Sequence, residues 1–357
     1  MAKNLRVTFL GSSSGGGPSE SRNCSSLVAD VLCDGTLWMV DAGEGTLRQF
    51  SLQPQGRYQL RVNNVKKIFV THMHADHTLG IITILRNLLL PPPQDLNSGG
   101  SSDFLSRRPA KIELYGPAGL RSFVRTILKM THTKTADRYV VHELLTSQDT
   151  VTPCDPPELR HDSENVGKDI VCDSDGFWRS FTSAPGKFSE VEVDAAPIMH
   201  RDPCLGYVIR EVSAPRRKLV LLGDTSDPSP ISPLAVSPSL LVHEATDAYI
   251  PTSVDSKAKR SAEVVKAKAL SRGHSTPVMA GEFARSIGAR RLVLNHIGGR
   301  FPAPRYQNGR DIRSAVMREI ERQASEAWGL GQARAAWDYM QVSIPPEEHD
   351  FSTIPNS

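Results

Sequence analysis

Short apolar runs recur along the chain, bounded by turns rich in glycine, serine and proline, and their length predicts β-strands. Stretches with helical spacing alternate with them, which is typical of an α/β fold. The expected strands are Arg6–Leu10, Ser26–Cys33, Leu37–Asp41, Val65–Val70, Lys111–Leu114, Val193–Met199, Cys204–Ile209, Lys218–Leu222, Leu240–His243, Arg291–Leu294 and Ala335–Ile344.

Amphipathic stretches between these runs predict helices. In Pro117–Met130 the apolar side chains recur every three or four residues and therefore fall on one face. The other expected helices are Gly45–Leu52, His77–Leu90, Arg260–Leu270, Pro277–Ser286 and Asp311–Trp328.

Two segments interrupt the alternation of strands and helices. Residues 91–109 are rich in Pro, Gly and Ser, and residues 146–190 are polar without a regular apolar period. We interpret both as surface insertions, and not as linkers between independent cores. This interpretation predicts a single domain over residues 1–357.

The residues that follow the run Val65–Val70 carry the strongest chemical signal. His72, His74, Asp76 and His77 fall within six positions. Residues two apart on a strand point to the same side, so His72 and His74 project together, and a turn would bring Asp76 and His77 to the same point. Imidazole and carboxylate groups are ligands that Zn²⁺ prefers. A loop that is rich in histidine by chance is the alternative, and the position directly after a strand favours a metal site.

Further candidate ligands stand at the ends of other predicted strands. His200, Asp224 and His296 each follow an apolar run, and α/β folds place their chemistry at such strand ends. Each residue alone could equally be a surface or capping residue, whereas the three together favour metal ligation. An aspartate can bridge two cations, and two metals about 3.5–4 Å apart can clamp a phosphoryl group.

Composition and charge exclude few classes of protein. The 357 residues carry a formal net charge of +3, which by itself does not establish a polyanionic partner. No apolar stretch reaches the roughly 18 residues that cross a bilayer, and the N-terminus leads directly into a strand pattern without a signal peptide. The five cysteines are scattered and odd in number, which favours a reducing compartment and no metal role. We therefore expect an intracellular protein, cytoplasmic or nuclear, with no membrane partner.

A basic stretch precedes one further histidine. Residues 257–272 hold six basic side chains and one acid, Glu263, directly before His274. Because phosphate contacts dominate nonspecific binding to nucleic acids, such a stretch suits an RNA substrate. A solvated helix face that serves only solubility is the alternative interpretation.

Together these motifs resemble those of the metallo-β-lactamase superfamily and, within it, of the ribonuclease Z (tRNase Z) family. The motif His72–His77 is common to the superfamily and indicates only a dinuclear metallohydrolase. More specific to ribonuclease Z are Asp41-Ala-Gly-Glu-Gly-Thr46, His243-Glu-Ala-Thr246 and Gly273-His-Ser-Thr276. The resemblance extends along most of the chain and implies an αββα sandwich with a dinuclear metal site at one sheet edge.

The resemblance also implies a complete set of metal ligands. They are His72, His74 and His200 for one zinc ion, Asp76, His77 and His296 for a second, and Asp224 as the bridge between the two. Manganese or iron would suit the same ligands. A metal-bound hydroxide is then the expected nucleophile, and Asp76 would help to orient or deprotonate it.

Two further catalytic side chains, His274 and Glu244, are implied beside Asp76. The imidazolium of His274 would donate a proton to the leaving oxygen, and Glu244 would hold the tautomer of that ring. The alternative for His274 is a neighbour of a helix N-cap. Asp41 resembles a carboxylate that orients ligand histidines, and a turn residue at a strand end is an equal alternative.

The activity implied by the family is endonucleolytic removal of the 3′ trailer from precursor tRNA, which leaves a 3′-hydroxyl on the tRNA. Short forms of the family carry a basic, Gly/Pro-rich arm that grips tRNA, whereas only the thirteen residues Arg210–Leu222 occupy that place here. This length predicts a hairpin and no arm, so a homodimer, a partner protein or an insertion would have to supply the grip on tRNA. The alternative function is a small-molecule phosphodiesterase or other metallohydrolase on the same fold. A non-catalytic binding module is a third hypothesis, which the complete ligand set disfavours.

Overall fold

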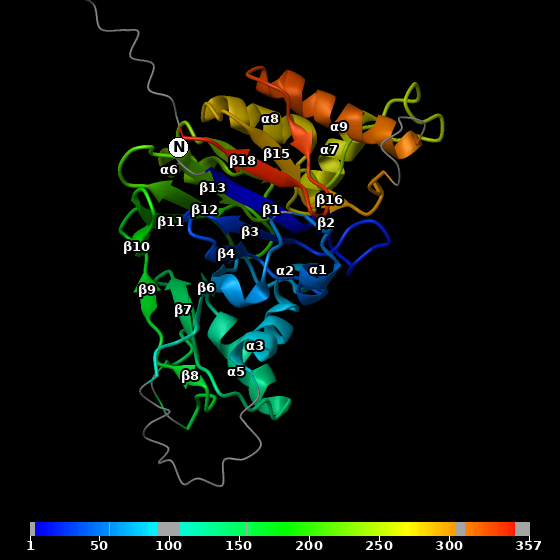
Figure 1. Ribbon diagram of the computed structural model, residues 1–357. Helices are drawn as coiled ribbons and strands as arrows, with labels where there is room; N and C mark the ends of the chain where they lie inside the picture. Colours follow the sequence, from blue (N-terminus) through cyan, green and yellow to red (C-terminus); the bar gives the residue numbers. More distant parts are fainter. Residues whose placement is uncertain are drawn as a thin grey trace, which may run out of the picture.

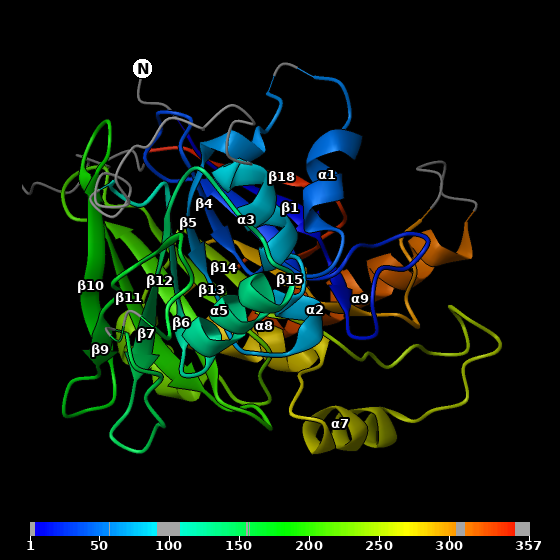
Figure 2. The same ribbon diagram turned by 90° about the horizontal axis from the view of Figure 1, so that it is seen from below.

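Two β-sheets pack face to face, and helices cover the outer face of each sheet (Figures 1 and 2). This arrangement confirms the predicted αββα sandwich. The structure, a computed structural model, describes residues 4–56, 58–90, 108–154, 156, 158–304 and 311–346. Among the helices of these residues, none combines the length and the apolar character that a membrane span requires.

In the first sheet, strands β4 to β9 pair in parallel, whereas β18, β1 and β3 pair antiparallel on the other side of β4. In order across the sheet, its strands are β18 (Gln341–Ile344), β1 (Leu5–Gly11), β3 (Ser26–Asp30), β4 (Leu37–Val40), β5 (Val65–Phe69), β6 (Ile112–Pro117), β7 (Tyr139–Leu145) and β8 (Glu164–Asn165), with β9 (Asp169–Val171) also paired to β7.

The second sheet, in order, contains β10 (Trp178–Pro185), β11 (Glu190–Ile198), β12 (Cys204–Glu211), β13 (Lys218–Leu222), β14 (Leu240–Glu244), β15 (Leu292–Asn295) and β17 (Arg334–Ala335). Strands β13, β14 and β15 are parallel. Strand β11 runs in the same direction, because two antiparallel pairings separate it from β13. The carboxyl ends of these four strands therefore lie at one edge. A short parallel pair, β2 (Ser13–Ser14) and β16 (Ile297–Gly298), lies outside both sheets.

The described helices divide between the two outer faces (Figure 1). The first sheet carries α1 (Thr46–Leu52), α2 (Ala75–Thr78), α3 (Ile81–Leu89) and α5 (Leu120–Met130), and the second carries α6 (Ser232–Ala235), α7 (Ala262–Ser271), α8 (Pro277–Ser286) and α9 (Ile312–Trp328). Single 3₁₀ turns lie at Val62–Asn64 and Ser229–Ile231.

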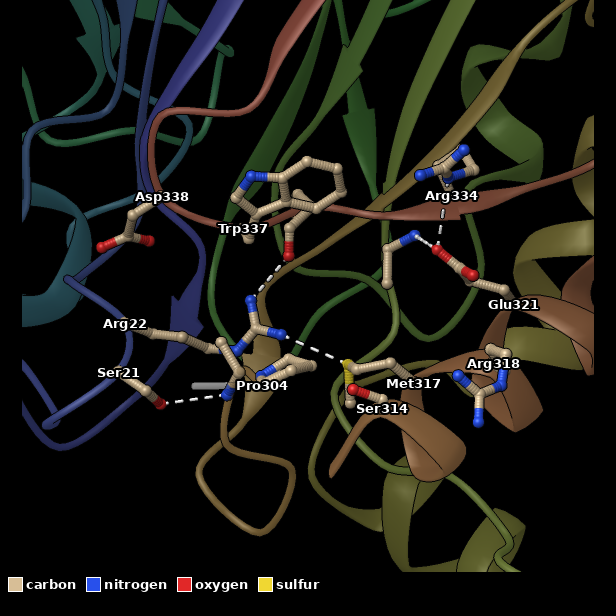
Figure 3. Close-up of a pocket in the computed structure, with 13 residues that line it drawn as sticks. Ser21, Arg22, Pro304, Ser314, Met317, Arg318, Glu321, Arg334, Trp337 and Asp338 are labelled. Carbon is tan, nitrogen blue, oxygen red and sulfur yellow. Dashed lines mark hydrogen bonds and ion pairs between the residues drawn. The ribbon is translucent and has the colours of Figure 1, made fainter. Parts of the chain in front are cut away.

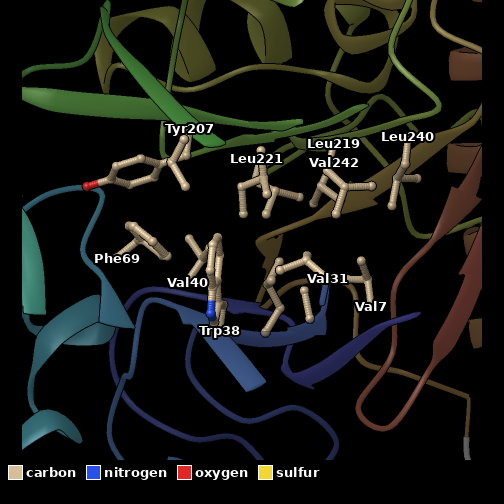
Figure 4. Close-up of a cluster of buried hydrophobic side chains, with 14 of the residues drawn as sticks. Val7, Val31, Trp38, Val40, Phe69, Tyr207, Leu219, Leu221, Leu240 and Val242 are labelled. Carbon is tan, nitrogen blue, oxygen red and sulfur yellow. The ribbon is translucent and has the colours of Figure 1, made fainter. Parts of the chain in front are cut away.

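The main core lies between the sheets, where Trp38, Phe69 and Tyr207 pack together (Figure 4). Along β4, Trp38 and Val40 face this core, whereas Leu37 and Met39 face the helices on the outside. Because helices cover the outer face, both sides of the strand are apolar. This explains why its sequence is a continuous apolar run without polar alternation.

The predicted helix His77–Leu90 is wrong in its continuity, because the structure divides it into α2 and α3. The division falls at Gly80, where an added Cβ atom would lie 2.1 Å from the carbonyl oxygen of Gly43. The Gly80 amide donates to the carbonyl of Ala42 at 2.8 Å. The close approach of these two backbones therefore requires glycine and sets the position of α2.

The predicted final strand Ala335–Ile344 is also wrong, because its two ends belong to different sheets. Strand β17 pairs with β15 in the second sheet, and β18 pairs with β1 in the first. The turn between them contains the partly buried carboxylate of Asp338, which accepts hydrogen bonds from Ser12 Oγ at 2.9 Å and from the Asn23 amide at 2.7 Å. These fixed donors hold the carboxylate and therefore the turn in place.

The segment 146–190 is more regular than its sequence indicated, since it contains β8, β9 and β10. The side chain of Trp178 is buried, and its Nε1 donates to the carbonyl of Ile170 at 2.9 Å. Strand β9 is short and largely exposed, which removes the apolar period that would have identified it. Of the other predicted insertion, residues 91–107 lie outside the described residues.

Candidate metal centre

The predicted ligands come from distant parts of the sequence and meet at one edge of the sandwich, where strands end. They are His72, His74, Asp76 and His77 after β5, His200 after β11, Asp224 after β13, and His296 after β15. Their ligand atoms form two groups with all members within 4.8 Å of one another, namely His72, His74, His200 and Asp224 in one, and Asp76, His77 and His296 in the other.

The carboxylate of Asp224 lies between the two groups and directs one oxygen toward each. Its Oδ2 is 3.6 Å from His72 Nε2, and its Oδ1 is 3.4 Å from His77 Nε2 and 3.3 Å from His296 Nε2. Zinc binds histidine nitrogen at about 2.0–2.1 Å, so neighbouring ligands in a tetrahedral shell lie about 3.3–3.4 Å apart. The observed spacing therefore fits a shared ligand between two metal positions.

His200 provides a separate test of whether these residues fit a metal ion. Its Nδ1 lies 2.7 Å from the carbonyl oxygen of Gly273, which makes Nδ1 the protonated nitrogen. The other nitrogen, Nε2, is then an acceptor, and it is buried without a hydrogen-bond partner among the described residues. Because a buried polar atom normally has a partner, a metal ion is the natural occupant beside Nε2.

Asp41 contacts the predicted ligand His77 at Nδ1, the ring nitrogen on the side away from the other ligands. Its Oδ2 lies 2.7 Å from His77 Nδ1 and accepts a hydrogen bond from Thr71 Oγ1 at 2.8 Å, while its Oδ1 accepts from the Thr71 amide at 2.8 Å. A carboxylate on Nδ1 fixes the ring so that Nε2 faces the metal. The structure therefore favours the orienting role of Asp41 over that of a simple turn residue.

Two residues of the centre have a left-handed backbone conformation that non-glycine residues rarely adopt. The φ angle is 57° at Asp41 and 54° at His296. Such conformations cost about 1–3 kcal/mol each and persist only where surrounding contacts hold them. The hydrogen bond at 2.9 Å between Thr246 Oγ1 and His296 Nδ1 is one such contact. Both side chains are thus held in place at a cost in folding free energy.

Burial and nearby carboxylates shift the pKa values of the histidines in this centre in opposite directions. Burial lowers the pKa of His72 and of His200, which keeps both rings neutral, as metal binding requires. Burial also acts to lower the pKa of His77, but the carboxylates of Asp224 and Asp41 outweigh it and raise that pKa well above its usual value. A metal ion would therefore displace a proton from His77.

Asp202 contributes a contact that sequence reasoning missed. Its Oδ2 lies 2.7 Å from His74 Nε2, while His74 Nδ1 lies 2.9 Å from His72 Nε2 and points into the centre. The carboxylate thus turns His74 so that Nδ1 becomes the ligand atom. No spacing in the sequence signals this contact, because Asp202 stands in an exposed loop and reaches a residue 128 positions away.

We expect Asp202→Ala to weaken metal binding about tenfold, because partners of this kind orient a ligand ring and raise its basicity. Competition with a chromophoric zinc chelator measures the change. Asp162→Ala removes an exposed carboxylate that none of the described contacts places near the centre, and it should leave the affinity unchanged. Equal zinc affinity in the Asp202 variant and the parent protein would contradict the orienting role.

His274 and Glu244 lie beside the metal ligands, as the sequence analysis expected. His274 Nδ1 is 2.9 Å from Glu244 Oε1, and the ring of His274 lies 5.1 Å from that of His200, centroid to centroid. The buried carboxylate of Glu244 also accepts hydrogen bonds from the amides of Thr225 at 2.8 Å and Thr246 at 3.1 Å. Burial acts to lower the pKa of His274, but the hydrogen bond with Glu244 and the charges of Glu244 and Asp224 together outweigh it and raise that pKa.

Comparison with known proteins agrees with this fold and with the presence of a metal site. The model of the family described as "Beta-lactamase superfamily domain" matches residues 37–297. The chain therefore belongs to the metallo-β-lactamase superfamily.

Within that superfamily, the chain belongs to the ribonuclease Z family. Ribonuclease Z of Streptococcus sanguinis is 31% identical, over 88% of this chain and 96% of that protein. The human protein zinc phosphodiesterase ELAC protein 1 is 29% identical, over 96% of this chain and 99% of its own length. The crystal structure of the short form of human tRNase Z superposes with a TM-score of 0.64 at 30% identity, and covers 95% of this chain and 99% of that one.

Proposed function

We propose that the chain is a metal-dependent endoribonuclease that removes the 3′ trailer from precursor tRNA and leaves a 3′-hydroxyl on the tRNA. The observation that carries the proposal is a seven-residue ligand set with the His274–Glu244 pair beside it, in a chain of the ribonuclease Z family. This substrate would place the activity in the cytoplasm or the nucleus.

We assign two zinc ions to the centre, held by the two groups that share Asp224, and relatives named zinc phosphodiesterase support the choice of metal. Manganese or iron would fit the same donors. When bound, such a pair activates water for attack on phosphorus and neutralises phosphate charge.

Three side chains of the protein would move or hold protons in this reaction. Asp76 Oδ2 lies 3.2 Å from His296 Nε2, so its carboxylate is positioned to orient the attacking water. His274, with Nδ1 held by Glu244, presents its other nitrogen to the leaving oxygen and can donate a proton there. Glu244 keeps that ring protonated, because its charge raises the pKa of His274.

The basic stretch before His274 supports contact with RNA. Figure 2 shows α7 at the lower side of the molecule, with a long connection from β14 before it and a short one to α8 after it. Arg260 forms a two-contact ion pair with Asp247, at 2.6 and 2.8 Å, and is therefore not available to phosphate. The exposed cationic side chains of the stretch are Lys257, Lys259, Lys266 and Arg272.

The structure has a short hairpin where short forms of the family would carry an arm. Strands β12 and β13 pair antiparallel, and only the six residues Val212–Arg217 connect them. The alignment with the human relative spans 398 residues, more than the 357 of this chain, so that relative contains segments without a counterpart here. We propose that a second copy of the chain or a partner protein supplies the grip on tRNA.

The test is incubation of zinc-loaded protein with a precursor tRNA, followed by mapping of both new ends. We expect a single cut that leaves a 3′-hydroxyl on the tRNA and a free trailer. Bis(p-nitrophenyl) phosphate serves as the control substrate. If that ester is hydrolysed while the precursor tRNA stays intact, the short hairpin favours the alternative of a small-molecule phosphodiesterase.

A further inference from the structure

A cavity of about 480 Å³ lies between α9, the segment that carries β17, the loop before β3, and Ala303 and Pro304 (Figure 3). None of its lining residues is among the predicted metal ligands, and the proposed reaction gives it no role. Its floor is formed by Met317, Ala335 and Ala336, all buried. The volume falls in the range of pockets that hold small ligands or single nucleotides.

An indole ring lines one side of this cavity. Trp337 is 38% exposed, whereas the other three tryptophans of the chain, Trp38, Trp178 and Trp328, are at most 3% exposed. The guanidinium carbon of Arg334 lies 5.9 Å from the Trp337 ring centroid. A partly exposed aromatic face with an arginine beside it is the arrangement on which nucleobases stack.

The cavity lining contains three arginines, Arg22, Arg318 and Arg334, against two acids, Glu321 and Asp338, and this balance favours an anion. Arg318 and Arg334 reach solvent at its mouth, and both can turn toward a bound phosphate. The carboxylate of Glu321 already accepts hydrogen bonds from the Ala335 amide at 2.9 Å and lies 3.5 Å from Arg334 Nε. The Ala335 amide thus satisfies one oxygen of this acid, and the single 3.5 Å contact leaves the exposed Arg334 side chain able to turn toward a phosphate. Arg318 forms no ion pair among the described residues and keeps its charge for a ligand.

Arg22 forms the inner wall and connects the cavity to the metal centre. Its Nη1 donates to the Ala336 carbonyl at 2.6 Å and to Ser12 Oγ at 2.7 Å. The carbonyl of Ser12 accepts from the amide of Ile297 at 2.8 Å, and Ile297 directly follows His296. A ligand in the cavity would therefore lie beside the strand pair β2–β16, which continues from the last predicted metal ligand.

We propose that this cavity binds a nucleotide, with the base stacked on Trp337 and the phosphate held by Arg318 and Arg334. The nucleotide could come from an unpaired position of an RNA substrate or from a free mononucleotide. Only the first source rests on the proposed function.

Equilibrium dialysis of the zinc-loaded protein against labelled AMP tests the proposal. We expect Trp337→Ala to raise the Kd for AMP about tenfold and Trp337→Phe to restore most of the binding, because stacking needs only a flat ring. Arg318→Ala should weaken AMP binding, whereas Arg322→Ala, on the same helix but outside the cavity, should not. AMP that binds at the metal centre alone would show the same Kd in the parent protein and in Trp337→Ala, and this result would overturn the proposal.

One competitor and one oligonucleotide complete the test. Ribose 5-phosphate should compete much more weakly than AMP, and equal competition would overturn the assignment of a base site. A short oligoadenylate that binds more tightly than AMP, with the same loss in Trp337→Ala, would identify the RNA strand as the source. Tighter binding of AMP would identify the free nucleotide. Absence of binding by both would overturn the proposal. Failure of the proposed function would appear separately, as uncut precursor tRNA in the cleavage assay.

Discussion

Replacing Asp224 by alanine is expected to remove metal from both positions and to lower precursor-tRNA cleavage by at least about 10³-fold. Asp224 is buried, and among the residues that the structure describes it is the side chain that directs an oxygen to each of the two ligand groups. A metal pair supplies several kcal/mol of transition-state stabilisation, and about 4 kcal/mol corresponds to about 10³-fold in rate. Zinc content per chain and single-turnover cleavage measure the two effects.

Two variants serve as controls for this experiment. Asp227→Ala, three residues further on, removes an exposed carboxylate and should keep both zinc and activity. Asp224→Asn keeps the shape of the side chain and removes its charge, so it tests the bridging charge without opening a cavity. An Asp224→Ala protein that still holds two zinc ions per chain and cleaves at the parent rate would show that this residue does not bridge.

Replacing His274 by alanine is expected to lower the cleavage rate about 10²–10⁴-fold while zinc content stays the same, since a positioned general acid contributes that much. Both variants should therefore lose activity, but only Asp224→Ala should lose zinc. His132→Asn, a change at an exposed histidine, is the matched control. Loss of zinc along with activity would assign His274 to the ligands instead.

The same role gives a pH dependence with a definite sign. A general acid must be protonated, so the rate should fall as pH rises through the pKa of His274, which Glu244 holds above its usual value of about 6.5. Glu244→Gln removes the carboxylate charge and should move this fall in rate to lower pH. The pH profile of single-turnover cleavage measures the shift, and an unchanged profile in Glu244→Gln would count against the pair.

Much of the centre could be predicted from the sequence because its residues obey a positional rule. His200, Asp224 and His296 each follow a strand, and strands that run in one direction end at one sheet edge, so these residues had to lie together. The continuous apolar runs identified the strands themselves, because both faces of each sheet are covered. Pattern and topology thus led to the same set of ligands.

The features that could not be predicted depend on long-range contacts, which produce no periodic pattern in the sequence. Asp202 turns His74 from a neighbouring loop, and the turn at Asp338 is held by donors more than 300 residues away. The cavity beside Trp337 is assembled from four separate segments, so its residues form no motif. Gly80 breaks a helix that its flanking residues predict, because a neighbouring backbone occupies the space of a side chain. Tertiary packing decides each of these features.

The crossing of residues 334–344 from one sheet to the other has a consequence for how the protein behaves in solution. Strands β17 and β18 are each the outermost strand on one side of their sheet, so a single short segment covers one border of each sheet. An uncovered strand presents free amides and carbonyls that can pair with another chain. A chain cut before Arg334 would uncover β15 and the apolar strand β1 together. The segment 334–344 therefore protects the protein against self-association and aggregation.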